Sequence, residues 1–236
     1  TLDVVRLEAL LRWTHPSLGP ISPAAFIPMA EKTGLIVAMG LWALETACRA
    51  ATEWPAETSV SVNLSPLQFA GGNLPGQIEQ ILTDTGLAPS RLHLEITEGV
   101  LLENTTFVMD AMNTLRSLGV RFSLDDFGTA HAGLAYLRRF PFDVLKIDKS
   151  FVQGADHNEE ARVLLAAIQG LGAACKLQVV AEGVETEGEL QVVRDLRCDY
   201  VQGYLTGWPE RVPFHRTKSS GLTEASTKPT LKLVGS

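Results

Sequence analysis

Short segments rich in branched apolar residues alternate along the chain with longer segments in which apolar residues recur every three or four positions. The first pattern predicts strands, and the second predicts amphipathic helices. The predicted strands are 4–10, 59–65, 92–98, 121–127, 144–148, 178–184 and 200–205. The predicted helices begin at Pro23 and otherwise cover 35–54, 75–86, 105–119, 160–172 and 187–196. A chain that repeats strand and helix in this way is expected to build βα units around a parallel sheet.

Glycines stand at the ends of several predicted helices. Glycine adopts the left-handed backbone conformation that ends a helix at little steric cost. We therefore expect four of them to cap the C-terminal ends of their helices: Gly34, Gly86, Gly119 and Gly172.

Polar side chains recur at the C-terminal ends of the predicted strands. They are Asn63, Glu95, Asp125, Asp126, Lys146, Asp148, Glu182 and Gln202. In a (β/α)₈ barrel these strand ends meet on one face, whereas an open sheet directs few of them into its single crevice. We therefore predict an α/β fold, a modified (β/α)₈ TIM-like barrel. Because only seven strands are predicted where a closed barrel has eight, we expect either that the sequence is a fragment or that another segment or chain closes the gap.

The composition changes along the chain near residue 214. The following residues are rich in Ser, Thr, Lys and Gly and show little periodicity. This predicts a barrel domain over 1–214 and a flexible C-terminal tail or linker over 215–236. Within that tail, the segment LKLV can form a short strand.

Charge and cysteine content narrow the possible partners and the cellular compartment. The formal net charge of -7 argues against a broad basic surface, so we expect no DNA or RNA partner. The longest apolar run, 35–44, is shorter than the roughly 18 residues of a membrane span, so we expect no membrane contact. Cys48, Cys175 and Cys198 are far apart and lack metal-type spacing, which indicates reduced thiols in a cytoplasmic protein.

The acidic residues at the predicted rim suggest metal chemistry. Adjacent side chains on a strand normally point to opposite faces, so the pair Asp125 and Asp126 at the end of an apolar strand requires an explanation. Carboxylates that meet at one face repel one another unless cations neutralise them. Oxygen ligands without Cys or His favour Mg²⁺ or Mn²⁺, and one bridging carboxylate can serve two ions. The candidate ligands are Glu8, Asn63, Glu95, Asp125, Asp126 and Glu182.

Each of these residues also has a purely structural interpretation. The two aspartates can cap the turn at Gly128, and Lys146 can form an ion pair with Asp148 two positions later. The other acidic residues can be helix caps or part of a polar strand face. These interpretations must all hold together, at the same end of successive strands, to replace the metal hypothesis.

Seven motifs, in order, resemble the EAL domain family, phosphodiesterases of the bacterial second messenger cyclic di-GMP. The similarity extends from about residue 4 to residue 209. The motifs are EALLRW (8–13), NLSPLQF (63–69), LEITEG (94–99), LDDFGT (124–129), FPFDVLKIDKSFV (140–152), VVAEGVET (179–186) and CDYVQGYLTGWP (198–209).

The resemblance implies a role for each matching residue. It implies one metal held by Glu8, Asn63, Glu95 and Asp125, and a second held by Asp125, Asp126 and Glu182. Glu182 would also accept a proton from the attacking water, while Lys146 would orient that water and offset negative charge. The implied reaction opens cyclic di-GMP to linear 5′-pGpG.

The resemblance also implies substrate contacts and supporting residues. The implied substrate contacts are Arg12 and the backbone after Leu11, Asp148, Glu185 and Tyr204. Two further residues are implied to support the ligands, Gln202 and Glu98, with Glu98 tethering the loop after the aspartate pair. The resemblance further implies a longer multidomain signalling protein and homodimerisation. It also implies a strand before the EALLRW motif, so the N-terminal strand of the barrel is expected to be missing or truncated in this sequence.

One loop departs from the family pattern and leaves a second function open. Where the family has Gly, Tyr and two Ser, this chain has Ala130, His131, Ala132 and Gly133. The lost hydroxyls and the lost glycine are expected to weaken the positioning of the ligands. The alternative is therefore a weak or inactive EAL receptor that binds cyclic di-GMP. A glycosidase carboxylate pair or a Schiff-base Lys146 explains neither Asn63 nor the paired aspartates.

Overall fold

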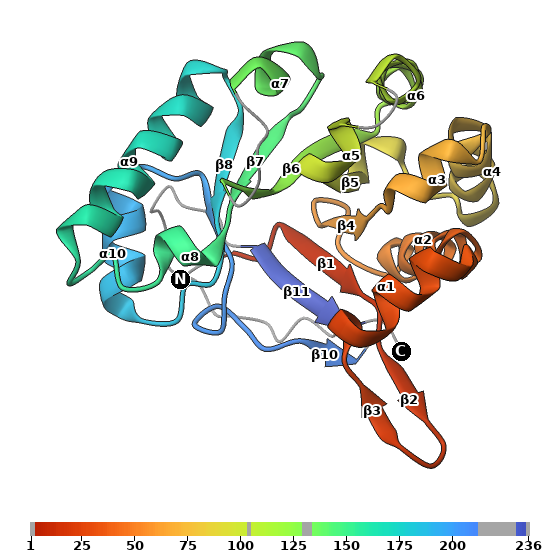
Figure 1. The fold of residues 1–236 in the computed structure, drawn as a ribbon, viewed down its shortest axis with the longest axis horizontal. Helices are drawn as coiled ribbons and strands as arrows, with labels where there is room; N and C mark the ends of the chain where they lie inside the picture. Colours follow the sequence, from red (N-terminus) through yellow and green to blue (C-terminus); the bar gives the residue numbers. More distant parts are fainter. Residues whose placement is uncertain (1–2, 103–104, 129–133, 212–229, 235–236) are drawn as a thin grey trace.

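A curled sheet of parallel strands forms the centre of the molecule (Figure 1). The computed structural model describes residues 3–102, 105–128, 134–211 and 230–234. The strand order is β10-β11-β1-β4-β5-β6-β7-β8-β9, with all neighbours parallel. The strands are β1 (Arg6–Leu10), β4 (Ser59–Asn63), β5 (Leu92–Thr97), β6 (Arg121–Phe127), β7 (Val144–Ile147), β8 (Gln178–Ala181), β9 (Tyr200–Val201), β10 (Glu210–Arg211) and β11 (Thr230–Val234). The prediction of a TIM-like barrel is confirmed: the seven predicted strands correspond to β1 and β4–β9, and β10 and β11 extend the same sheet.

Helices cover the outer side of the sheet (Figure 1). The six longest match the predicted ones: α1 (Pro23–Thr33), α2 (Leu35–Thr52), α4 (Leu74–Thr85), α6 (Thr105–Leu118), α9 (Glu159–Ala174) and α10 (Glu187–Asp195). Shorter helices were not predicted: α3 (Pro66–Ala70), η1 (Pro89–Arg91), α5 (Glu98–Leu102), α7 (Leu134–Arg139) and α8 (Lys149–Val152). An antiparallel hairpin of β2 (Trp13–His15) and β3 (Gly19–Ile21) projects from the body of the molecule.

One of the four predicted glycine caps is wrong. Gly34 and Gly86 lie just after their helices in the left-handed conformation, and Gly119 follows α6 with φ 104°. Helix α9, however, continues past Gly172 to Ala174. A Cβ on Gly172 would lie 2.5 Å from Val179 Cγ2, so this glycine is needed for close packing of α9 on the sheet.

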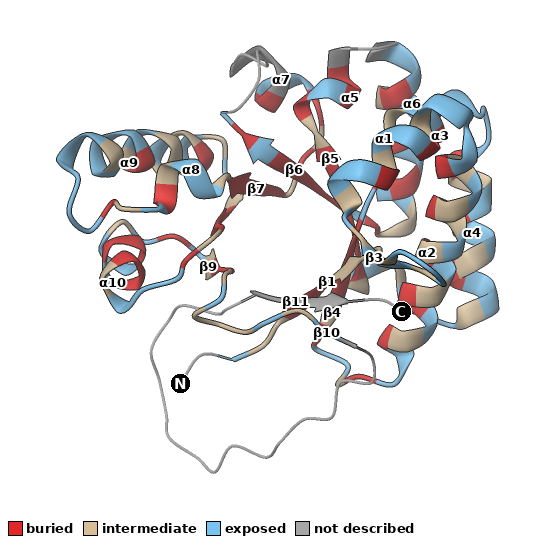
Figure 2. Ribbon diagram, turned by 60° about the horizontal axis from the view of Figure 1, so that its bottom comes forward, coloured by how far each residue is buried: buried red, intermediate tan, exposed pale blue. Residues whose placement is uncertain are grey.

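Successive strand residues alternate between the helices and the interior of the curled sheet. Apolar residues such as Leu94 on β5 and Leu124 on β6 are fully buried in the layer under the helices. Their neighbours Glu95 and Asp125 point to the interior, where they contact Lys146. Figure 2 shows buried residues along most strands, so both faces of the sheet are covered. Because of this alternation, polar side chains face the interior of the curled sheet, and apolar side chains pack between the sheet and the helices.

Strand β11 occupies the edge of β1 that faces away from β4. The pairing joins five residues of each strand, from Arg6 with Thr230 to Leu10 with Val234, and Glu210–Arg211 extends the sheet beyond β11. The segment LKLV of the predicted tail therefore forms part of a strand. Residues 212–229 and 235–236 lie outside the described part of the chain, and the division into 1–214 and 215–236 stays a prediction.

Helix α2 contains the longest apolar run of the chain. By length and composition alone it is apolar enough to cross a membrane, with a mean hydropathy of 1.3 over 18 residues. Its buried residues, among them Ile36, Gly40, Leu44 and Cys48, recur every four positions and face the body of the molecule. Packing against the sheet therefore accounts for this apolar stripe.

Candidate metal and substrate site

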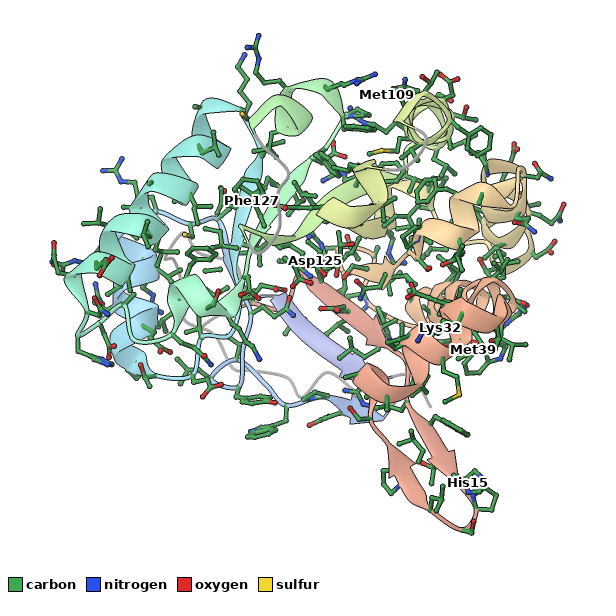
Figure 3. The ribbon with its side chains drawn as sticks, viewed as in Figure 1. His15, Lys32, Met39, Met109, Asp125 and Phe127 are labelled. Atoms are coloured by element: carbon green, nitrogen blue, oxygen red, sulfur yellow. The ribbon has the colours of Figure 1, made fainter. Side chains whose placement is uncertain are left out.

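Lys146 lies at the centre of a cluster of carboxylates inside the curled sheet. Its Nζ atom is 2.6 Å from Glu95 Oε2 and 2.9 Å from both Asp125 Oδ1 and Glu182 Oε1. Glu8 Oε2 lies at 3.7 Å. These carboxylates come from β1, β5, β6 and the end of β8, and Figure 3 shows Asp125 near the centre of the molecule. Carboxylates up to 174 positions apart in the sequence thus lie around the same ammonium group.

Two amide side chains hold the carboxylate of Glu8. Asn63 Nδ2 donates to Glu8 Oε1 at 2.9 Å, and Gln202 Nε2 donates to Glu8 Oε2 at 2.9 Å. Glu8 and Gln202 are buried, whereas Asn63 is exposed at the strand end. Both oxygens of Glu8 are therefore fixed by side chains from distant parts of the sequence.

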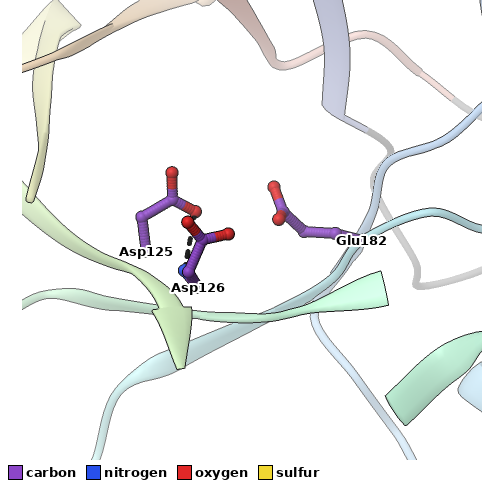
Figure 4. A group of neighbouring side chains, drawn as sticks. All are labelled: Asp125, Asp126 and Glu182. Atoms are coloured by element: carbon purple, nitrogen blue, oxygen red, sulfur yellow. Dashed lines mark hydrogen bonds between the residues drawn. The ribbon is translucent and has the colours of Figure 1, made fainter. Parts of the chain in front are cut away.

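A bend in β6 explains the adjacent aspartates. Asp126 has φ 53°, and the pairing of β6 with β7 shifts register between Leu124 and Phe127. Aspartate tolerates the left-handed region better than most residues do. Because the backbone turns there, both carboxylates face Glu182, and ligand oxygens of these three residues lie within 4.8 Å of one another (Figure 4). Asp125 Oδ1 also accepts a hydrogen bond from the backbone N–H of Asp126 at 3.1 Å.

The electrostatics of the cluster show an excess of buried negative charge. Burial disfavours the charged form of Lys146, but Asp125, Glu182, Glu8 and Glu95 outweigh this and hold its pKa well above the ordinary value. Burial, together with the charge of Glu8, raises the pKa of Glu95 to about 8 despite its contact with Lys146. One ammonium therefore does not neutralise all the carboxylates around it.

This donor set fits hard divalent cations. Asp125, Asp126 and Glu182 approach one another closely enough to share an ion, and Glu8, Asn63 and Glu95 add further oxygen atoms nearby. Oxygen-only coordination is the preference of Mg²⁺, Mn²⁺ and Ca²⁺. The pKa of Glu95 is raised first by burial and then by the negative charges of Glu8 and Asp125, and bound cations would offset the second of these causes.

A cleft of about 350 Å³ opens above this cluster. Its walls include four of the five predicted substrate contacts, Arg12, Asp148, Glu185 and Tyr204, together with Asp126 and Glu182. Leu11 is not part of the wall; its backbone oxygen accepts a hydrogen bond from Arg12 Nη1 at 2.9 Å, and Leu10 lines the cleft instead. The volume is within the range of small-molecule sites.

Asp148 and Lys146, both in the described part of the chain, do not form the ion pair that was considered as a purely structural alternative. Asp148 caps α8 by accepting a hydrogen bond from Ser150 N at 3.0 Å, and the contacts around this N-terminus keep the pKa of Asp148 low although its partial burial opposes this. An ion pair between Lys146 and Asp148 is not among the contacts of the described residues, because Lys146 turns inward to the carboxylates.

Glu98 makes the contact that the family resemblance implies. It is buried at the start of α5, and its Oε1 accepts a hydrogen bond from Gly128 N at 3.1 Å. This bond ties the loop after the aspartate pair to the start of α5. The altered loop residues 130–133 lie outside the described part of the chain.

A second polar layer lies below the carboxylates, two positions earlier on each strand, and it was not predicted from the sequence. Arg6, Ser61, His93 and Ser123 are buried, and each has a side-chain atom without a hydrogen-bond partner in the described structure. The guanidinium of Arg6 lies 5.7 Å from the centre of the Tyr200 ring. Strand alternation could have revealed this layer, because its residues stand two positions before Glu8, Asn63, Glu95 and Asp125.

The three cysteines serve packing. All are free, and Cys48 and Cys198 are buried. Burial raises the pKa of both thiols to about 12, which leaves them unreactive near neutral pH.

The curled parallel sheet, the acidic cluster at its interior and the cleft above them define an α/β-barrel protein with a polar site at the C-terminal strand ends. The family model described as "EAL domain" matches residues 1–209. The chain therefore belongs to the EAL domain family.

Two curated relatives are similar to this chain over most of its length. An uncharacterised signalling protein of Caulobacter vibrioides is 45% identical over 210 residues, covering 89% of this chain and 26% of the relative. MucR of Pseudomonas aeruginosa, a bifunctional diguanylate cyclase/cyclic di-GMP phosphodiesterase, is 41% identical over 210 residues, covering 87% of this chain and 31% of MucR. The chain thus spans a quarter to a third of the length of these relatives.

A solved structure of the MucR phosphodiesterase from P. aeruginosa in complex with c-di-GMP has the same fold. Its TM-score is 0.82 at 40% sequence identity, and the match covers 88% of this chain and 87% of that one. The agreement extends over almost the whole of both chains, so the barrel-like arrangement is that of the family.

Proposed function

We propose that this chain is a metal-dependent phosphodiesterase that hydrolyses cyclic di-GMP to linear 5′-pGpG. The observation that carries the proposal is the convergence of four carboxylates, those of Glu8, Glu95, Asp125 and Glu182, around Lys146 beneath a cleft. Membership of the EAL domain family and the name of MucR support the substrate. A structural cluster of caps and ion pairs would not need this many carboxylates around one cation.

Two divalent cations, Mg²⁺ or Mn²⁺, complete the proposed site. Glu8, Asn63, Glu95 and Asp125 would hold one of them, and Asp125, Asp126 and Glu182 the other. When bound, such ions lower the pKa of water and neutralise the charge that develops on the phosphoryl group.

Two side chains of the site have the remaining catalytic roles, proton transfer and charge stabilisation. The water oxygen forms a bond to phosphorus as the bond from phosphorus to the 3′ oxygen breaks, which leaves a 5′ phosphate on the linear product. Glu182 accepts the proton of that water, and the 3′ oxygen takes up a proton as it leaves, which gives a 3′ hydroxyl. Lys146 remains protonated because of its carboxylate neighbours, so it donates hydrogen bonds and offsets negative charge. A protonated Lys146 is also a poor nucleophile, which argues against a Schiff-base mechanism.

The cleft walls suit a guanine dinucleotide. Arg12 supplies positive charge for phosphate, and the carboxylates of Asp148 and Glu185 are acceptors for the N–H groups of guanine. Tyr204 supplies an aromatic face for stacking. Glu98 and Gln202 act indirectly, because they hold the loop after Asp126 and the carboxylate of Glu8.

The proposal is tested by following 5′-pGpG formation from cyclic di-GMP with Mg²⁺ or Mn²⁺. We expect turnover that stops in EDTA and returns when metal is added back. Glu8→Ala and Asp125→Asn should each lower kcat at least about 100-fold, because the first removes a metal ligand and the second removes the negative charge of the ligand shared by both ions. Turnover that survives both substitutions, or that persists in EDTA, contradicts the mechanism. Ca²⁺ should inhibit, because its larger and looser coordination fits a two-metal site poorly.

A receptor without catalysis is the second candidate. It is favoured by the departures from the family pattern at residues 130–133. Cyclic di-GMP binding by calorimetry without product after prolonged incubation with metal would establish it. We further propose that the chain acts within a longer cytoplasmic signalling protein and can form a homodimer, which sedimentation would test.

A further inference from the structure

Tyr204 and Trp208 form a stacked aromatic pair on the surface next to the cleft. Their ring centres are 3.9 Å apart, and the ring planes differ by 9°. Both side chains remain exposed, at 51% and 64%. Single exposed aromatic residues are common on proteins, so the exposure alone indicates nothing. The parallel alignment of two exposed rings is the feature that requires an explanation.

The backbone between the two rings is held in a tight turn. Gly203 O accepts hydrogen bonds from Thr206 N at 3.0 Å, Gly207 N at 3.2 Å and Thr206 Oγ1 at 2.8 Å. This turn places the side chains of Tyr204 and Trp208 on the same side. The pair is therefore produced by local backbone structure and does not depend on burial.

The same turn is attached to the segment that carries the carboxylates of the site. Leu205 N donates to Val184 O at 3.1 Å, and Val184 N donates to Gln202 O at 3.1 Å. A Cβ on Gly203 would lie 2.1 Å from Val184 O, so the two backbones are in direct contact. The aromatic pair consequently has a fixed position relative to Glu182 and Glu185.

The two rings differ in their relation to the cleft. Tyr204 lines the cleft, as do Gly207 and Pro209 on either side of Trp208, but Trp208 does not. Trp208 therefore covers one face of the Tyr204 ring and leaves the other for a ligand in the cleft. An isolated exposed tyrosine would lose rotational freedom when it bound a ligand, whereas a stacked one has lost it already.

We infer that Trp208 is a positioning residue for nucleobase binding, holding the Tyr204 ring so that its free face stacks on a guanine in the cleft. The inference rests on the proposed function for the identity of the ligand. A planar base is the ligand that fits best, because Asp148 and Glu185 add acceptors for its N–H groups beside the aromatic face. Trp208 itself makes no contact with the ligand.

The test is equilibrium binding of cyclic di-GMP to the full chain, measured by calorimetry in Ca²⁺ buffer with product formation followed in the same samples. We expect Trp208→Ala to weaken binding about 3- to 10-fold, and Trp208→Phe to restore most of the affinity, because a phenyl ring still stacks. In the presence of Mg²⁺, the Trp208→Ala variant should show a raised KM with kcat nearly unchanged.

A double-mutant cycle separates positioning from a general structural role. If Trp208 acts through Tyr204, then Trp208→Ala should have almost no effect on affinity in a Tyr204→Ala background. Trp42→Ala is the matched control, since Trp42 is 52% exposed on α2, beside Glu45 and Arg49. Its affinity should equal that of the unmodified chain.

The outcomes distinguish this inference from the proposed function. If the unmodified chain binds cyclic di-GMP and Trp208→Ala binds it equally well, the positioning role is refuted while the proposed function stands. If the effect of Trp208→Ala is the same with and without Tyr204, the role of Trp208 is structural and the inference also fails. If the unmodified chain neither binds nor cleaves cyclic di-GMP, both conclusions are overturned.

Discussion

Glu95 shows how the environment of a single residue sets its chemistry. It is buried on β5 beside Glu8 and Asp125, and only Lys146 opposes the rise of its pKa to about 8. A carboxyl group with an ordinary pKa releases its proton near pH 4.5. The folded, metal-free chain therefore retains a proton on Glu95 over a pH interval in which the unfolded chain has lost it.

This difference predicts a pH dependence of stability in EDTA. The stabilising contribution of Glu95 is complete below about pH 4.5 and is lost as the pH rises through about 8. A difference of one bound proton changes the free energy of unfolding by about 1.4 kcal/mol per pH unit. Urea denaturation between pH 6 and 8 should show part of this slope.

Glu95→Gln provides the comparison, because glutamine resembles a carboxyl group that is always protonated. The free energy of unfolding of this variant should depend less on pH than that of the unmodified chain over the same interval. Parallel pH profiles for the two proteins would mean that Glu95 is ionised in the folded state.

At the scale of one element, helix α9 illustrates how close packing can override helix propensity. Gly170 and Gly172 both lie inside this helix. A Cβ added to Gly170 would meet nothing within 4 Å, whereas one added to Gly172 would lie 2.5 Å from Val179 and 3.2 Å from Leu145. Glycine therefore destabilises the helix at position 170, whereas at position 172 it is required for close packing against the sheet.

The two glycines give a matched pair of substitutions. Gly170→Ala should raise the free energy of unfolding by about 0.5–1 kcal/mol, because alanine is the better helix former. Gly172→Ala should lower it by about 1–3 kcal/mol, because the methyl group collides with the sheet. Urea denaturation at one pH measures both. A stabilising effect of alanine at both positions would show that α9 can move away from β7 and β8.

At the scale of the whole molecule, curling of the sheet brings the two ends of the chain together. Glu8 and Gln202 are 194 positions apart and share a hydrogen bond. The strand that carries Glu8 is flanked by β4 on one edge and by β11 on the other. The position of Glu8 therefore depends on a segment from the far end of the sequence.

Replacing residues 230–234 by Gly-Ser-Gly-Ser-Gly tests this dependence. Without a regular partner strand, the backbone amides of β1 should exchange with solvent at least about tenfold faster, as measured by hydrogen–deuterium exchange. The same replacement at residues 221–225 is the control and should leave this exchange unchanged. Unchanged protection of β1 in the first variant would mean that β11 contributes nothing to holding that strand.

Much of this arrangement could be predicted from the sequence. The seven strands and six longer helices were visible as local periodicity, and the polar residues at strand ends indicated a shared rim. The position of Gly172 inside α9 was not visible, since a glycine near a helix end has the same local pattern whether it caps the helix or packs. The stacking of Trp208 on Tyr204 also escaped prediction, because a spacing of four residues predicts contact only once the turn between them is known.

The sequence by itself determined the seven main strands, the six longer helices, the kinds of side chain at the strand ends and the family, because these follow from local pattern and from ordered motifs. Only the tertiary structure decided which carboxylates surround Lys146, how the backbone at Asp126 turns two adjacent aspartates toward Glu182, and which strand pairs with β1. These outcomes depend on contacts between distant segments. Such contacts form only when the sheet curls, so they cannot be predicted from any local pattern of residues.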